Sequence, residues 1–213
     1  MLGTKTRELL DRARGPLGPT VSVDFGCEHG PLAELAELLS EMNGFFAFNA
    51  GLQIFRVGDE GVGPELSQWN SGEMWKEVFE GLADDVFCFG QDVLGMQFAI
   101  RNGSEVVRFD PENARSYPVG NSLEDWAAWL LSRTNINATA TLAKVWQDRN
   151  GALEPHERLL PLRFFELGGE VSLDNLKVVD AVEAMRLRGP IAVQLRRDRA
   201  GDDLGTAVEY ASD

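Results

Sequence analysis

Few residues in the sequence have the types and spacing needed for catalysis or metal binding. One of the two histidines lies in Cys27-Glu28-His29, where a thiol, a carboxylate and an imidazole follow one another. A zinc site needs three or four converging ligands, and no second cluster of such residues stands out in the sequence. We therefore interpret this tripeptide as a turn with an incidental thiol, and His156 as an exposed residue. No metal ligand is predicted.

Other catalytic arrangements are also missing from the sequence. No serine lies in Gly-x-Ser-x-Gly, and the glycines of residues 58–63 lack the lysine of a phosphate-binding loop. The adjacent acids Asp84-Asp85 and Asp202-Asp203 are typical of a solvated acidic surface, because acid–base catalysis needs two carboxyl groups in a cleft with separated pKa values. We predict a protein without catalytic residues or cofactor, and keep a carboxylate-based enzyme as a remote alternative.

The net charge restricts the partners that the protein can bind. The chain has 20 Lys and Arg against 34 Asp and Glu, a formal net charge of −14. Such a surface repels phosphate backbones and attracts cationic partners over long distances. The sequence also lacks both a run of about 18 apolar residues and the apolar centre of a signal peptide. We expect a cytoplasmic protein that binds a basic protein, with no nucleic-acid or membrane partner.

Acidic and aromatic residues combine in one stretch of the chain. Trp75 falls on the apolar face of a predicted helix, and we expect it in the core. Trp69 lies outside that helical spacing, which makes it the better candidate for an exposed contact with a partner. The predicted partner-binding residues are Asp59, Glu60, Glu65, Trp69, Glu73, Glu77, Asp84 and Asp85. A second group, Arg186, Arg188, Arg196, Arg197 and Arg199, is expected to pair with surrounding acids.

The elements that would position these residues follow from apolar periodicity and turn residues. The pattern predicts helices over residues 31–42, 71–82, 122–131 and 134–148, a hairpin over 45–57, and strands at 86–89, 95–100 and 105–109. Residues 15–30 suggest a connector or an edge strand. In the last third, Asp174 is expected to cap a helix bearing Leu176, Val179, Val182 and Met185, and Gly189-Pro190 is expected to interrupt the pattern.

These elements predict an α+β fold with an antiparallel sheet of about five to six strands flanked by helices. We divide the chain into an N-terminal helix and connector (residues 1–30), a core (31–133) and a C-terminal extension packed on the core (134–213). The chain is long enough for one large domain with an extension.

The order of several short motifs resembles the SUKH superfamily of Smi/Knr-type proteins. The motifs are residues 38–44 (LLSEMNG), 52–55 (LQIF), 89–92 (FGQD), 95–98 (GMQF), 106–110 (VVRFD) and 121–126 (NSLEDW). No single motif is specific, so the resemblance rests on their order and spacing. It covers roughly half of the chain, and the stretches at 167–169 and 174–176 look like an extension found in some bacterial members.

The resemblance implies a non-enzymatic α+β protein. Members serve mainly as immunity proteins against polymorphic bacterial toxins, and less often as regulatory or scaffold modules inside the cell. We therefore expect a protein that neutralises a cognate toxin by direct binding, with its acidic surface covering a basic toxin domain. An intracellular regulatory or scaffold protein of the Smi/Knr type is the alternative. Both hypotheses predict a protein–protein interface.

Overall fold

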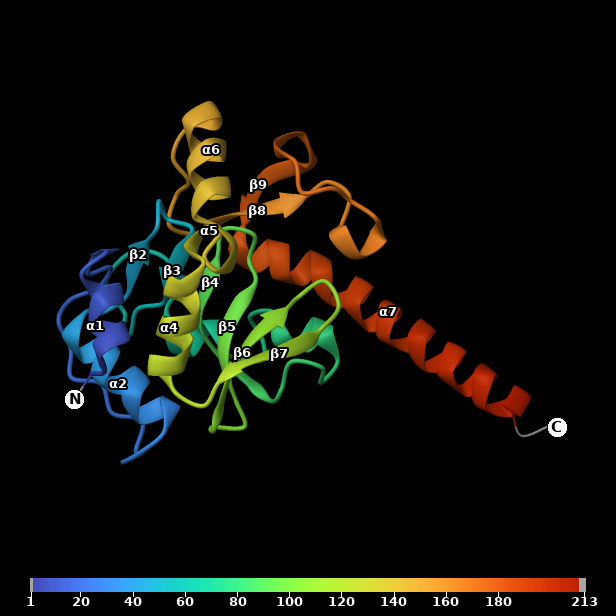
Figure 1. Ribbon diagram of the computed structural model, residues 1–213, viewed down its shortest axis with the longest axis horizontal. Helices are drawn as coiled ribbons and strands as arrows, with labels where there is room; N and C mark the ends of the chain where they lie inside the picture. Colours follow the sequence, from blue (N-terminus) through green and yellow to red (C-terminus); the bar gives the residue numbers. More distant parts are fainter. Residues whose placement is uncertain (1, 211–213) are drawn as a thin grey trace.

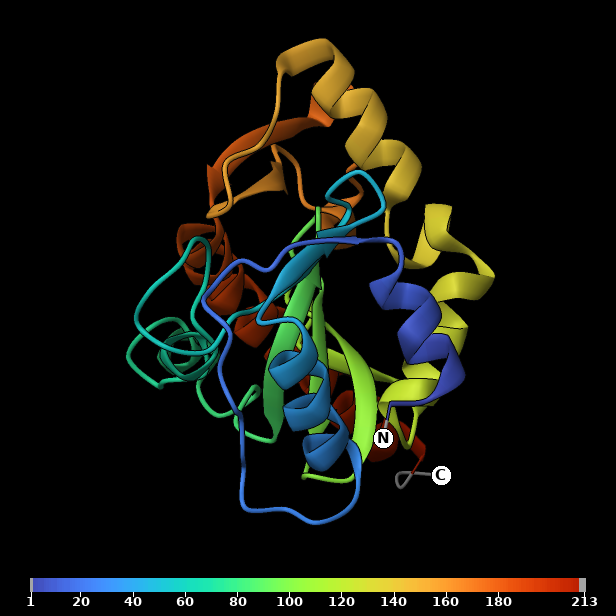
Figure 2. The same cartoon turned by 90° about the vertical axis from the view of Figure 1, so that its left-hand side faces the viewer.

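The protein has an α+β fold, as its sequence predicts. The computed structural model describes residues 2–210, with side chains described for residues 2–199. An antiparallel sheet has seven strands, each paired with its neighbour in sequence, and a second sheet has two strands. Helices α1 (Thr4–Leu10), α2 (Pro31–Glu41) and α4 (Leu123–Ser132) lie on one side of the large sheet, and α7 (Ala181–Tyr210) lies on the other (Figures 1 and 2).

The large sheet contains the predicted hairpin and the predicted three-strand meander. Its strands are β1 (Ala13–Arg14), β2 (Phe45–Ala47), β3 (Leu52–Ile54), β4 (Val86–Asp92), β5 (Gln97–Arg101), β6 (Glu105–Asp110) and β7 (Arg115–Gly120). Asn102 and Gly103 form the β5–β6 turn with φ of 50° and 72°, the left-handed backbone that these residue types tolerate. The edge strands β1 and β7 were not predicted, because β1 is very short and β7 contains Pro118, which suits only an edge.

Two predicted helices have the expected starts. Pro31 occupies the first turn of α2, where its missing N–H costs nothing. The side chain of Ser122 accepts a hydrogen bond from the backbone N–H of Asp125 (3.0 Å) and so caps α4. Both helices bury their apolar faces in a cluster of buried residues that extends from Leu9 to Ala192.

Helix α1 is held by a side chain from another helix. Gly3 precedes α1 and offers no side chain to cap it. Instead, Glu124 of α4 accepts hydrogen bonds from the N–H of Lys5 (2.7 Å), the N–H of Thr6 (3.0 Å) and the hydroxyl of Thr6 (3.0 Å). Burial alone would raise the pKa of Glu124, but these hydrogen bonds outweigh it, and the pKa falls below its ordinary value.

Replacing Glu124 by Gln is expected to destabilise the docking of α1 by about 1 kcal/mol at neutral pH, the typical value of a helix cap. Because the pKa of Glu124 is lowered in the folded protein, its contribution is present above the ordinary pKa of 4.5 and is lost as the pH falls through the lower folded value. Hydrogen exchange of the α1 amides measures both effects. Glu41→Gln, on the exposed side of α2, is the control, and equal exchange in the two variants would contradict the capping role.

The prediction of an α-helix after Ser71 is wrong. Residues 71–82 form turns and a 3-10 helix, η1 (Lys76–Phe79), which Glu80 (φ 51°) and Gly81 (φ 88°) end in left-handed conformations. A short helix, α3 (Leu66–Trp69), comes before it. The side chain of Glu65 accepts a hydrogen bond from the N–H of Gln68 (2.7 Å) and fixes the start of α3, so helical structure begins at Leu66, before the predicted start at residue 71.

The C-terminal third departs from prediction at three places. It contains α5 (Thr134–Asn137), α6 (Ala140–Asn150), β8 (Glu157–Pro161), η2 (Phe165–Leu167), η3 (Leu173–Asn175), β9 (Leu176–Asp180) and α7. The helix predicted over residues 134–148 is divided at Ala138 and Thr139, because Thr139 has a left-handed backbone (φ 49°). The prediction that a helix follows Asp174 is wrong, because residues 176–180 form strand β9, which pairs with β8. Asp180 is the actual cap, and its Oδ1 accepts the N–H groups of Val182 (2.9 Å) and Glu183 (3.1 Å).

The predicted interruption at Gly189-Pro190 is also wrong, since α7 continues through both residues. A side chain at position 189 would lie 2.8 Å from the carbonyl oxygen of Val78. Glycine at this position therefore allows α7 to pack closely against the segment that contains η1.

Candidate functional site

Two of the predicted partner-binding residues are buried. Trp69 is 2% exposed, and its indole N–H donates to Oε1 of Gln97 (2.9 Å). The ring packs against Phe55 and Trp75, at centroid distances of 5.0 and 6.1 Å. The prediction that Trp69 is an exposed contact is therefore wrong, because the α3 turn directs it into the core. Glu65 is also buried and caps α3, whereas Trp75 lies in the core as predicted.

The hydrogen bond from Trp69 to Gln97 can be measured with two matched substitutions. Trp69→Phe keeps an aromatic ring but leaves the buried oxygen of Gln97 without this donor. Trp75→Phe removes an indole N–H that has no hydrogen-bond partner among the described residues. We expect Trp69→Phe to lose about 1–3 kcal/mol more unfolding free energy than Trp75→Phe, measured by urea denaturation. Equal losses would show that the bond does not stabilise the fold.

The other predicted acids remain on the surface. Asp59 and Glu60 lie in the loop between β3 and α3, and Asp84-Asp85 precede β4. Glu73 precedes η1, and Glu77 lies within it. They belong to residues 58–85, a segment beside α7 at the left of Figure 2. Glu77 lies 3.7 Å from Arg186. Five of the acids make no ion pair with any side chain that the structure describes: Asp59, Glu60, Glu73, Asp84 and Asp85. We call these five residues the acidic surface.

Four of the five predicted arginines pair with acids, as expected, whereas Arg196 makes no ion pair with the described side chains. Arg197 contacts Glu80 (2.5 Å) and Arg199 contacts Glu166 (2.6 Å). Together with Arg186 they connect α7 to the η1 and η2 segments. Arg188 differs from the others, because it is 1% exposed.

A layer of buried polar side chains, which the sequence analysis missed, lies between the large sheet and the C-terminal third. Gln53, Gln91 and Gln97 are paired neighbours on β3, β4 and β5, and all three are buried. Their amides form a ladder: Gln91 donates to Gln53 (2.9 Å), and Gln97 donates to Gln91 (3.4 Å). We call this arrangement the glutamine ladder.

The C-terminal third supplies the partners of the ladder. Arg158 of β8, 1% exposed, donates to the side-chain oxygen of Gln53 and lies 5.9 Å from the centroid of the Phe46 ring. Gln53 in turn donates to the carbonyl oxygen of Pro155 (2.9 Å), and the Gln97 amide contacts the sulfur of Met185 (3.7 Å). Burial lowers the pKa of Arg158 to about 9, so the side chain remains cationic at neutral pH.

A second buried charge group surrounds Arg188. Its Nη2 donates to the carbonyl oxygen of Leu94 (2.8 Å), and its Nε lies 3.9 Å from Oε1 of Glu112. Asp92, fully buried, accepts the N–H groups of Leu94 (2.9 Å) and Met96 (3.1 Å). Burial raises the pKa of Asp92 and of Glu112, while the charge of Arg188 acts in the opposite direction. This pairing stabilises the contact between α7 and the sheet.

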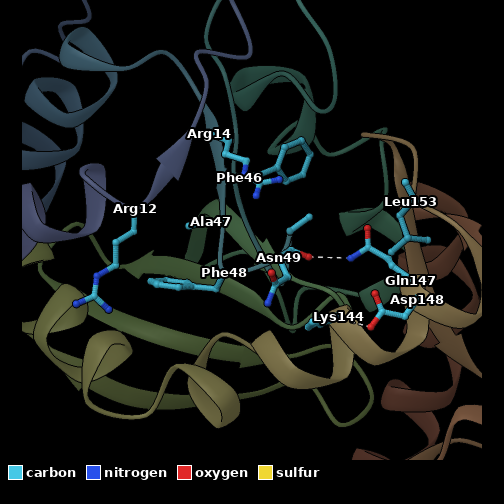
Figure 3. A pocket seen from close by; sticks show the side chains of 12 residues that line it. Arg12, Arg14, Phe46, Ala47, Phe48, Asn49, Lys144, Gln147, Asp148 and Leu153 are labelled. Atoms are coloured by element: carbon cyan, nitrogen blue, oxygen red, sulfur yellow. Dashed lines mark hydrogen bonds and ion pairs between the residues drawn. The ribbon is translucent and has the colours of Figure 1, made fainter.

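An open cleft of about 400 Å³ lies on another face, between β1, the β2–β3 turn and α6 (Figure 3). Phe46 and Phe48 form part of its wall, and Arg12, Arg14 and Lys144 bring positive charge. None of the predicted partner-binding residues lines this cleft. The sequence signal that was overlooked is the pair of half-buried aromatics, Phe46 and Phe48, next to the β2–β3 turn.

The sulfur and imidazole groups do not assemble into a reactive site. Burial raises the pKa of the Cys88 thiol to about 12, which keeps it protonated, and Cys27 is exposed. Over residues 2–199, no three His, Cys, Asp or Glu side chains are placed to hold a metal ion. None of the helices in the described part of the chain combines the length and apolar character needed to cross a membrane.

The fold and these features define an α+β protein with a polar layer under its sheet and five exposed acids within residues 58–85. No family model matches the sequence, and no curated protein matches it. Among solved structures, the crystal structure of Atu4351 from Agrobacterium tumefaciens is similar, with 12% identity and a TM-score of 0.47. The match covers 89% of this chain and 81% of the other. Similarity at this level assigns no function.

Proposed function

We propose that the protein is a non-enzymatic binding module, an immunity protein that neutralises a cognate bacterial toxin by direct contact. The acidic surface is the observation that supports this function. Its carboxylates are exposed and make no ion pair with the described side chains, so their charge is available to a partner. The order of motifs that resembles the SUKH superfamily supports the same proposal.

The partner in this proposal is a basic toxin domain. A net charge of −14 accelerates the approach of a cationic protein, and the unpaired acids then oppose its basic residues. A nuclease uses basic side chains to bind phosphates, so an acidic protein seated on them would block its substrate. This mechanism needs no catalytic residue in the immunity protein.

The experiment combines the purified protein with the toxin encoded by the neighbouring gene. A stable complex and loss of toxicity in co-expressing cells are expected. The variant Asp84→Lys/Asp85→Lys should bind more slowly, by about tenfold or more at low salt. The control Glu154→Lys/Glu170→Lys changes the net charge equally at exposed acids outside residues 58–85, and should retain most of the association rate.

Two outcomes would contradict this proposal. Absence of a complex together with unchanged toxicity would reject the immunity function and favour the regulatory or scaffold alternative. Equal slowing by both double variants would show that overall charge alone drives association and that the acidic surface is not the contact region.

A further inference from the structure

The β2–β3 turn that forms one wall of the cleft has an unusual backbone. Phe48, Asn49 and Ala50 have φ of 55°, 59° and 59°, three successive left-handed residues without a glycine. Each such residue is sterically unfavourable, and conformations of this kind persist only where the surrounding structure enforces them. They occur preferentially at binding sites and active sites.

Helix α6 enforces this conformation from the opposite wall. The amide of Gln147 donates to the carbonyl oxygen of Asn49 (2.8 Å), and the amide of Asn49 donates to the carbonyl oxygen of Ala140 (3.3 Å). At Gly51, a side chain would lie 2.2 Å from the carbonyl oxygen of Ala138. The two walls are therefore connected, and the cleft is pre-formed.

The rim of the cleft is cationic on a strongly acidic protein. Arg12, Arg14 and Lys144 line it, with Asp148 as the acidic member. Arg12 pairs with Glu8 (2.6 Å) and Lys144 with Asp148 (2.5 Å). Arg14 is exposed and makes no ion pair or side-chain hydrogen bond within residues 2–199. Its guanidinium is thus available to a ligand.

The walls next to these cations are aromatic. In Figure 3, Arg14 and Phe46 lie at one side of the cleft, and Lys144 and Asp148 lie at the other. Phe48 lies on the side toward Arg12. The rings of Phe46 and Phe48 are half-buried, so each still presents surface to the cleft. A flat ligand gains apolar contact on these rings while its charged group meets Arg14.

We propose that the cleft binds a small organic anion with a flat apolar body. The volume of about 400 Å³ suits a small molecule. The cationic rim selects a carboxylate, sulfonate or phosphate group, and the aromatic walls select a ring system over an inorganic ion. This site is independent of the acidic surface and of the proposed toxin binding.

The test uses naphthalenesulfonate as the probe and follows the backbone amide NMR signals of the folded protein. Naphthalenemethanol, which has the ring without the charge, and sodium sulfate, which has the charge without the ring, are the ligand controls. We expect saturable shifts at residues 46–50 and 144–153 with naphthalenesulfonate. Both controls are expected to bind more weakly.

Two matched variants locate the anion. Arg14→Gln should weaken binding by about fivefold, the size expected for loss of one exposed ion pair. Lys177→Gln removes an exposed charge from β9, outside the cleft, and should leave binding unchanged. Absence of saturable shifts at residues 46–50, equal binding of naphthalenemethanol, equal binding of sulfate, or unchanged affinity of Arg14→Gln would each overturn the proposal.

Discussion

Replacing Arg188 by Met is expected to lower the free energy of unfolding by about 3–5 kcal/mol at neutral pH, the range found when one partner of a buried ion pair is removed. Arg188 is 1% exposed and faces Glu112, and its charge also acts on Asp92 and Asp110. Methionine fills most of the space but leaves Glu112 without its paired cation, whereas Asp92 keeps its ion pair with Arg108 (3.5 Å). Urea denaturation followed by tryptophan fluorescence measures the loss.

The defect of Arg188→Met should depend on pH with a defined sign. Burial raises the pKa of Asp92 and of Glu112 in the folded protein. Below the unfolded-state pKa, such a carboxyl group is protonated in both states and does not affect the free energy of unfolding. As the pH rises from the unfolded-state pKa through the folded-state pKa, the group lowers the free energy of unfolding. Without Arg188 this effect increases, so the variant should differ from the wild type less at about pH 4 than at about pH 7.

Two further variants test the ionic origin of this effect. Arg196→Met removes an exposed arginine of the same helix and should change stability by no more than about 0.5 kcal/mol. Adding Glu112→Gln to Arg188→Met should restore part of the loss, because a neutral amide needs no counter-ion. A pH-independent defect without such rescue would indicate that Arg188 acts through packing alone.

Replacing Trp126 by Ala is expected to cost about 3–5 kcal/mol, as for other fully buried large aromatics. The ring of Trp126 packs edge-to-face against Phe89 (5.1 Å between centroids) and Phe98 (5.7 Å). These contacts connect α4 to β4 and β5, so truncation leaves a cavity between helix and sheet. Thermal or urea unfolding reports the loss.

Trp129 provides the comparison for this truncation on the same helix. It is only partly buried and packs on Phe98 at 6.2 Å. Trp129→Ala should therefore cost no more than about half as much as Trp126→Ala. Equal costs in the two variants would contradict the assignment of Trp126 as the residue that anchors α4.

The sequence predicts correctly those segments whose apolar spacing fits only one type of secondary structure, either helix or strand. The helices at Pro31 and Ser122 and the hairpin at Asn102-Gly103 have start and turn residues that agree with their periodicity. Residues 176–182 lack this agreement, because Leu176 and Val179 suit the spacing of a helix and also the pairing of β9 with β8. Tertiary contact decides between these structures, and Asp180, rather than Asp174, then caps the helix.

The candidate sites were only partly predictable for a related reason. Gln53 and Gln91 are 38 residues apart in sequence, and they meet only through the register of the sheet, which the sequence does not specify. The position of Trp69 depends on the Glu65 cap and on Gln97, a residue of a distant strand. Exposed acids such as Asp84 and Asp85, by contrast, need no partner to stay at the surface, and they were placed correctly.

The glutamine ladder has a consequence for the order in which the chain emerges from the ribosome. Residues 45–120 contain β2 to β7, all pairing with sequence neighbours, so this sheet can form before β8 and α7 are translated. Its still uncovered face then presents the amides of Gln53, Gln91 and Gln97 to water, whereas apolar side chains there would favour aggregation of the nascent chain. Arrival of Arg158 and Met185 closes this face last, and the same amides then orient the incoming segment.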